Sequence, residues 1–257
     1  MKTKGNKVTK DELFVMSDSE PQFVIQGLIP AKTPQTKYVS CRTGTEIKAD
    51  QTVVEDTERF QLELDAAGKA SFQTSKSQYL SLGADTNIGT SATKTSAAEK
   101  FTLVWQNERV RMQASNGKYV VVKANGGMAA TGDGGEDAGA FTFTLINRPQ
   151  IVLRGQFGFI GLKGASGRLV CNANQEVFDL ESENGSYFFK SSAGKFWDVD
   201  ADGAHANAAA RVPFFLEFVT RSNMLIKTKA GKYLEGEQNG GYKATGTSSQ
   251  INTLWEY

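Results

Sequence analysis

The hexapeptide DVDADG, residues 198–203, has the residue types and spacing of a calcium-binding loop. Asp198, Asp200 and Asp202 alternate along the chain and a glycine follows, a pattern that lets carboxylates converge on one cation. The twelfth position, which should supply a bidentate glutamate, is Ala209, and no helical pattern flanks the loop. We therefore predict that DVDADG is a strand followed by a hairpin turn, and that it is not a metal site.

Residue types that serve in catalysis are present, but without partners. His205 is the single histidine and lies among small residues, whereas a catalytic histidine needs a positioned nucleophile or acid. Cys41 and Cys171 have no histidine nearby in sequence and are predicted to be free thiols. The glycine-rich segment 131–139 lacks the Lys-Ser/Thr pair of a phosphate-binding loop. We predict a protein that is not an enzyme and has no cofactor.

The overall charge gives no reason to expect nucleic acid or an anionic membrane as a partner. Lysine and arginine total 29 against 28 acidic residues, a net charge of +1 in 257 residues. No apolar run approaches the roughly 18 residues that a membrane span needs, and no apolar stretch follows the basic N-terminus as in a secretory signal. The tetrapeptide KDEL at 10–13 acts as a retention signal only at a C-terminus. These features predict a cytoplasmic protein with no membrane insertion.

Two series of residues recur along the chain with a common period. Each series has six members, spaced 36–41 residues apart, so the chain contains six repeats of about 40 residues. The first series is Tyr38, Tyr79, Tyr119, Phe159, Phe196 and Tyr233. The second is Phe60, Phe101, Phe141, Phe178, Phe214 and Leu254.

Each repeat has the pattern of short β-strands. In segment 108–115, Val110 and Met112 alternate with Arg111 and Gln113, as in a strand with one buried face. Asn-Gly and Asp-Gly pairs follow at equivalent places and suit hairpin turns, because these residues tolerate positive φ. The predicted turns are Asn125-Gly126, Asp202-Gly203 and Asn239-Gly240. No segment has a sustained helical period, so the predicted class is all-β.

Four strands per repeat and three repeats per unit describe a β-trefoil, in which six strands close a barrel and three hairpins cap it. The six repeats therefore predict two tandem β-trefoil domains. We place them at residues 21–147 and 148–257, after an N-terminal extension at 1–20.

Motifs along the whole chain are similar to those of the fascins, a family of actin-bundling proteins with four β-trefoils. KDELF resembles the end of the second trefoil, and the others fall in the order of the third and fourth. They are FQLELD, ASNGKYV, LINRP, GFIG, SAGKFW, PFFLEF and LWEY. The resemblance implies a monomer that binds actin filaments and, in its full-length context, cross-links them into parallel bundles. It also implies a cytoplasmic, cytoskeletal location in filopodia or other actin bundles.

Basic residues of the last repeat are candidates for contact with the acidic surface of an actin filament. Met224 and Ile226 are expected to point inward, which directs Lys227 outward. The turns at GFIG and GKYLEG complete the candidate surface, although here the chain has neutral or acidic residues where fascins tend to have basic ones or histidine. The predicted actin-binding residues are Arg221, Lys227, Lys229, Lys232, Gln156, Phe157, Glu235 and Lys243.

Two other functions are compatible with tandem trefoils. Many β-trefoils are carbohydrate-binding modules, which commonly carry a Gln-x-Trp signature in each repeat. Trp105, Trp197 and Trp255 all lack a glutamine two residues earlier. The third possibility is a structural half of a longer protein that makes no filament contact of its own.

Overall fold

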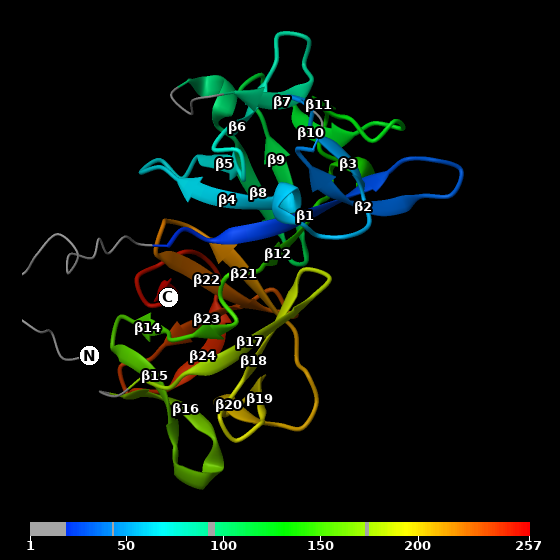
Figure 1. The fold of residues 1–257 in the computed structure, drawn as a ribbon. Helices are drawn as coiled ribbons and strands as arrows, with labels where there is room; N and C mark the ends of the chain where they lie inside the picture. The colour runs from blue at the N-terminus through cyan, green and yellow to red at the C-terminus, as the bar shows by residue number, and fades with distance from the viewer. Residues whose placement is uncertain (1–18, 43, 92–95, 173–174) are drawn as a thin grey trace, which may run out of the picture.

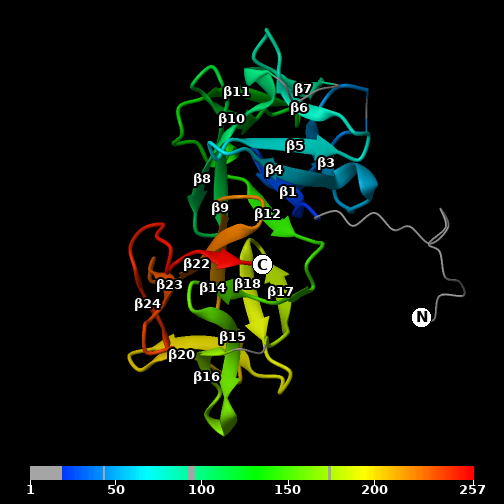
Figure 2. The same ribbon diagram turned by 90° about the vertical axis from the view of Figure 1, so that its left-hand side faces the viewer.

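The chain is all β in the computed structural model, which describes residues 19–42, 44–91, 96–172 and 175–257. Within these ranges it forms 25 named strands, and the helical elements are three-residue 3-10 turns. Figures 1 and 2 show two globular units, one above the other. The turns are η2 (Asp56–Glu58), η3 (Ala97–Glu99), η4 (Asp137–Gly139) and η5 (Gly164–Ser166). None of the helical elements in those ranges has the length or apolar character to span a membrane. The KDEL tetrapeptide lies outside the described residues, as does nearly all of the N-terminal extension.

Six strands close the barrel of the first unit. They are β1 (Gln22–Ile29), β4 (Arg59–Leu64), β5 (Ala70–Thr74), β8 (Thr102–Gln106), β9 (Arg109–Gln113) and β12 (Thr142–Leu145). Antiparallel ladders join β1 to β4, β4 to β5, β8 to β9, and β12 back to β1. Two single bridges, Ala70 to Phe101 and Val110 to Phe141, complete the ring.

Three hairpins cap one end of this barrel. They are β2 (Gln35–Ser40) with β3 (Lys48–Gln51), β6 (Tyr79–Leu82) with β7 (Ile88–Ser91), and β10 (Tyr119–Val122) with β11 (Met128–Gly132). Single bridges link the hairpins to one another, for example Lys48 to Gly127. Closed barrels with linked caps leave little free strand edge.

The second unit repeats this architecture, with its first barrel strand split in two. Its barrel strands are β13 (Gln150–Ile151), β14 (Arg154–Gly155), β17 (Phe178–Glu183), β18 (Ser186–Lys190), β21 (Phe214–Phe218), β22 (Asn223–Thr228) and β25 (Trp255–Glu256). Its hairpins are β15 (Gly158–Lys163) with β16 (Arg168–Asn172), β19 (Phe196–Asp200) with β20 (Gly203–Ala208), and β23 (Tyr233–Gly236) with β24 (Tyr242–Gly246). The predicted fold, tandem β-trefoils, is confirmed. The exact domain boundaries stay a prediction.

The repeated residues have distinct packing roles. The aromatics of the first series are half-buried, and the residue after each one lies in the core. Those core residues are Val39, Leu80, Val120, Ile160, Trp197 and Leu234. Phenylalanines of the second series are almost fully buried. The choice of Leu254 as their sixth member is wrong, because Leu254 is half-buried and Trp255 occupies the core beside Met224.

Local backbone conformation agrees with the turn chemistry read from the sequence. Gly126, Gly203 and Gly240 have φ of 81°, 132° and 81°, which confirms the three predicted hairpin turns. The alternation predicted for β9 is only partly right. Val110 and Met112 are buried as expected, but Arg111 is only 9% exposed because the η4 turn covers it.

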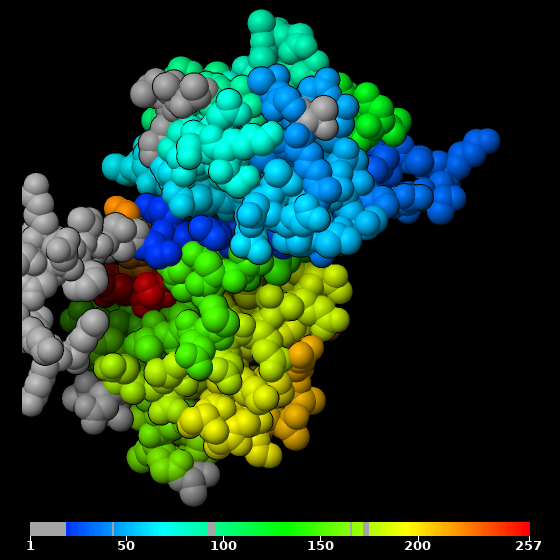
Figure 3. Space-filling view, viewed as in Figure 1, coloured from blue at the N-terminus to red at the C-terminus, as the bar shows by residue number. Residues whose placement is uncertain are grey.

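The two trefoils share one hydrophobic core. Phe218 of the second trefoil contacts Phe23 and Trp105 of the first, with ring centroids 5.2 and 6.0 Å apart. Beside these rings, the Tyr187 hydroxyl donates to the Phe143 carbonyl at 3.2 Å and accepts from the Leu145 amide at 3.1 Å. Figure 3 shows the blue first strand at the base of the upper unit, directly against the lower unit. The junction is therefore a packed interface and not a flexible linker.

Candidate functional site

The eight predicted actin-binding residues lie in three separate places on the second trefoil. Arg221 is on the turn before β22, at the junction with the first trefoil. Lys227, Lys229 and Lys232 lie at the opposite end of β22. The other four lie on the β14–β15 turn and the β23–β24 hairpin. Because the six residues of β22 span about 17 Å, Arg221 and the lysines do not form one compact patch.

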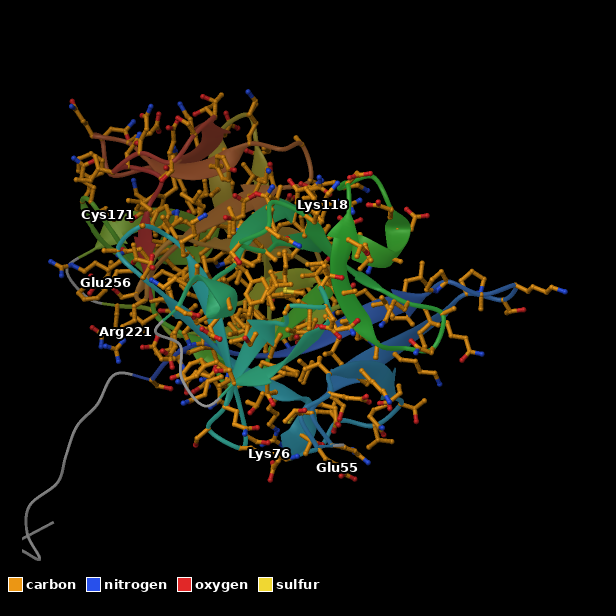
Figure 4. The ribbon with its side chains drawn as sticks, turned by 90° about the horizontal axis from the view of Figure 1, so that it is seen from above. Glu55, Lys76, Lys118, Cys171, Arg221 and Glu256 are labelled. Carbon is orange, nitrogen blue, oxygen red and sulfur yellow. The ribbon has the colours of Figure 1, made fainter. Side chains whose placement is uncertain are left out.

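Arg221 is engaged by the first trefoil's entry segment. Its Nε lies 2.6 Å from Oε1 of Glu20, and its carbonyl accepts a hydrogen bond from the Tyr257 hydroxyl at 2.8 Å. Figure 4 shows Arg221 and Glu256 on the same side of the molecule. Half of the Arg221 side chain is exposed, so its charge is partly neutralised but still reaches solvent.

Lys227 does not point freely outward, so that expectation is wrong. Its side chain is only 17% exposed, and its amine lies 3.0 Å from Oε1 of Glu217 and 5.1 Å from the centre of the Tyr233 ring. The Tyr233 hydroxyl donates to the other Glu217 oxygen at 2.9 Å. Burial alone would lower the pKa of Lys227, but the hydrogen bond and charge of Glu217 outweigh it and raise that pKa. Lys227 is therefore part of a structural ion pair.

We expect Lys227→Met to lower the free energy of unfolding by about 2 kcal/mol, because it leaves the buried Glu217 carboxylate without its cation. Urea unfolding measures this change. Lys243→Met is the matched control: Lys243 pairs with Glu237 at 3.0 Å but is 39% exposed. We expect about 0.5 kcal/mol or less for it. A Lys227→Met protein of unchanged stability would contradict the structural role.

Lys229 and Lys232 are the candidate lysines that remain available. Both are exposed on the β22–β23 turn, and neither forms an ion pair within the described part of the chain. The turn itself is well ordered by hydrogen bonds: the Thr228 amide donates to the Lys232 carbonyl at 2.8 Å, and Gly231 has φ of 77°. Two ammonium groups are thus held on a rigid turn.

The β14–β15 turn and the β23–β24 hairpin form a mixed surface. Phe157 is 37% exposed and packs over Gly236, where an added Cβ would come within 3.1 Å of the ring; Gln156 beside it is exposed. Glu235 accepts hydrogen bonds from the side chains of Thr245 and Asn252, and Lys243 pairs with Glu237 instead of its cross-strand neighbour Glu235. This surface offers an exposed aromatic ring but little net positive charge.

Glu217 is the neighbour of Lys227 that sequence reasoning missed. Its side chain is 11% exposed. It neutralises the charge of Lys227 and accepts the hydrogen bond of the Tyr233 hydroxyl. A signal was present, because Glu217 is the single charged residue in the apolar run PFFLEF. A charged residue inside such a run is usually buried with a partner.

Two of the three aspartates of DVDADG accept hydrogen bonds from amides of their own hairpin. The Asp200 carboxylate accepts from the amides of Asp202 and Gly203 at 2.8 and 3.2 Å, and the Asp198 carboxylate accepts from the Val199 amide at 2.7 Å. His205 lies opposite Asp198 on β20, with Nε2 3.5 Å from Asp200. Within the described ranges, no three His, Cys, Asp or Glu residues are arranged to hold a metal ion.

Cys41 and Cys171 are both free thiols, as predicted. Cys41 is buried in the first trefoil and packs as a small apolar side chain. Cys171 is half-buried on β16 and its thiol donates to the Phe157 carbonyl. Neither cysteine is paired with a histidine in the part of the chain that the structure describes, so neither has the base that activates a nucleophilic thiol.

Comparison with known proteins identifies relatives for the whole chain. A family model described as a fascin domain matches residues 34–143, 90–177 and 156–257. Fascin-2 of Bos taurus is 37% identical over 96% of this chain, and fascin-2 of Homo sapiens is 36% identical over the same share. Fascin of Strongylocentrotus purpuratus is 30% identical over 100% of it. The chain spans 50–52% of the length of these relatives.

Proposed function

Because this chain belongs to the fascin family, we propose that it binds actin filaments without enzymatic activity and takes part in cross-linking them into parallel bundles. The chain spans about half the length of the curated relatives it matches, so bundling is proposed for its full-length context. In this proposal it acts as a monomer in the cytoplasm, within the actin cytoskeleton of filopodia or other bundles.

The proposed filament contact rests on the turn that holds Lys229 and Lys232. Its two lysines are exposed and lack carboxylate partners in the described residues, so their field extends into solvent. Attraction of this kind accelerates encounter with an acidic filament surface and weakens as salt rises. Lys227 is left out of the proposed contact because Glu217 neutralises it.

The packed junction between the trefoils supplies the second requirement for cross-linking, which is a fixed geometry. A cross-linker must hold two filaments at separate sites, and the effective concentration at the second site depends on how rigidly the sites are connected. The aromatic contacts among Phe23, Trp105 and Phe218 favour a stiff body over two flexibly linked domains. A chain with only two trefoils is expected to bind filaments without forming robust bundles.

We expect the double variant Lys229→Glu with Lys232→Glu to weaken binding to actin filaments about tenfold at low salt, since it reverses both charges on the turn. High-speed co-sedimentation over a range of filament concentrations measures the affinity. Lys195→Glu is the matched control, because Lys195 is exposed at the equivalent position of the SAGK turn. That turn has the same backbone hydrogen bonds and Gly194 has φ of 74°.

The outcomes separate the proposed function from its alternatives. Equal filament affinity of the double variant and the unaltered chain would favour a structural half with its contacts elsewhere. Binding to glycans, with no binding to filaments, would favour a carbohydrate-binding module. Robust pelleting of bundles at low speed by this chain alone would contradict the requirement for further trefoils.

A further inference from the structure

A cavity of about 440 Å³ on the first trefoil has two arginines in its wall. It lies between β1, the start of β2, the β8–β9 hairpin and the η4 turn. Its lining residues are Gln26, Leu28, Thr36, Gln106, Arg109, Arg111, Asp137 and Ala140. None of them belongs to the proposed filament contact.

Arg111 is a buried charge that forms no direct salt bridge within the described residues; the Glu136 carboxylate acts on it only through longer-range charge. Its Nε donates to Oε1 of Gln106 at 3.0 Å and its Nη1 to the carbonyl of Glu136 at 2.7 Å. The Glu136 carboxylate is turned to its own loop, where it accepts from the amides of Asp133 and Gly134 at 2.8 and 2.9 Å. Within the described residues Arg111 makes no ion pair. Burying a guanidinium without a directly bonded counter-ion is costly, and an anion in the cavity would offset that cost.

The internal repeats show that this position does not need an arginine. Arg111 lies opposite Val104 on β8, and the same place in other barrel hairpins holds Ser71, Phe188 or Leu225. All three are buried and uncharged. The fold therefore tolerates neutral side chains here, and Arg111 is specific to this one repeat.

The rest of the cavity wall is rich in hydrogen-bond donors. Arg109 contributes a second guanidinium, which donates to the Thr142 hydroxyl and makes no ion pair in the described part of the chain. Gln106 uses its carbonyl oxygen to accept from Arg111, which leaves its amide nitrogen to donate. Gln26 and Thr36 add further polar groups, and among the described lining residues Asp137 supplies the carboxylate. Two arginines against one aspartate give the lining side chains a net positive charge.

We propose that this cavity binds a phosphate-bearing small molecule, with Arg109 and Arg111 holding the phosphate group. Guanidinium groups match phosphate oxygens in geometry and charge, and hydrogen bonds between ionised groups are stronger than neutral ones. The volume exceeds that of a phosphate ion and lies within the range of cavities that hold small organic ligands. A hexose phosphate is of the expected class, with its hydroxyls at Gln26 and Thr36.

Isothermal titration of the full chain with inorganic phosphate and with a hexose phosphate tests the proposal. We expect both to bind, and about 20 mM phosphate to raise Tm by about 4 °C over sodium chloride of equal ionic strength if Kd is about 1 mM. Arg109→Gln should weaken binding about tenfold, by loss of one charge-assisted contact. Asp137→Asn should strengthen binding about threefold, because it removes the opposing carboxylate.

Arg154→Gln is the matched control. It removes one exposed arginine far from the cavity, which pairs with Glu256 at 3.6 Å, and should leave binding unchanged. The higher phosphate affinity expected for Asp137→Asn cannot arise from misfolding. This variant therefore keeps the test decisive even if an arginine variant is unstable. The proposal is overturned by heats and Tm values no different from those in chloride, or by equal phosphate affinity of the Arg109 and Asp137 variants. Capture by vesicles carrying a phosphoinositide, without binding of either soluble phosphate, would also overturn it.

Discussion

Phe218→Ala is expected to lower the free energy of unfolding by about 3–5 kcal/mol and to split unfolding of the chain into two transitions. The wild-type chain, whose trefoils share one core, should unfold in a single transition. Replacing the ring by a methyl group creates a cavity between the trefoils, so each trefoil would then unfold more nearly by itself.

The size of this effect follows from the position of the ring. Phe218 is 3% exposed and meets three other aromatic rings. It packs edge-on against Phe23 at 5.2 Å and Tyr257 at 5.5 Å, and contacts Trp105 at 6.0 Å. Aromatic pairs of this geometry add about 0.5–1.5 kcal/mol each to the stabilisation from buried area.

Scanning calorimetry measures both parts of this prediction. Phe214→Ala is the matched control, because Phe214 lies on the same strand and is 1% exposed, but packs inside the second trefoil against Phe189 and Trp197. It should cost a similar free energy without decoupling the first trefoil. If both variants gave the same single transition, the junction would not be what couples the two trefoils.

Glu58→Gln is expected to lower the free energy of unfolding by about 3 kcal/mol at neutral pH and to flatten its dependence on pH between 6 and 2. The Glu58 side chain is 0% exposed. Burial alone would raise the pKa of this carboxyl, but hydrogen bonds from Arg42, Ser40, Thr57 and the Glu55 amide outweigh burial. Together they lower the pKa of Glu58 to about 2.

The direction of the pH effect follows from this lowered pKa. The unfolded chain binds the proton near pH 4.5, whereas the folded chain resists protonation until about pH 2. The stabilisation by Glu58 is therefore complete above about pH 5 and is lost as the pH falls toward 2. Glutamine carries no charge, so the variant lacks this contribution at every pH.

Urea unfolding at several pH values tests the prediction, with Glu55→Gln as the matched control. Glu55 also pairs with Arg42, at 2.9 Å, but its side chain is 65% exposed. Figure 4 shows it at the edge of the molecule. An exposed pair contributes little, so we expect a change of at most about 1 kcal/mol. Parallel pH curves for Glu58→Gln and the unaltered chain would show that Glu58 is not the group responsible.

Much of the fold could be predicted from the sequence because its signals are local and repeated. The period of about 40 residues, the alternating strands and the glycine turns each depend on a few neighbouring residues, and six copies reinforce one another. The all-β class, the tandem trefoils and the turns at Gly126, Gly203 and Gly240 followed directly. The one marker that failed, Leu254, falls in the last repeat, where Trp255 takes the core position.

The candidate site was less predictable because its electrostatics depend on residues distant in sequence. The alternation of buried and exposed residues along the strand predicts that Lys227 points outward. Glu217 and Tyr233, on neighbouring strands, nevertheless contact its side chain and bury it. Arg221 meets Glu20, 201 positions away, because the two trefoils pack together. Arg111 is covered by a turn 25 residues later.

The amino-acid sequence by itself determined the architecture of this protein and its resemblance to the fascins, because the repeats and motifs can be recognised from residues that are close together in the chain. Only the tertiary structure decided which charges remain available. In the described residues, Lys229 and Lys232 form no ion pair and stay exposed on a turn, Lys227 is neutralised, and Arg111 is buried beside a cavity without a direct salt bridge. The reason is physical: the effect of a charge depends on its burial and its neighbours in space, and folding sets both.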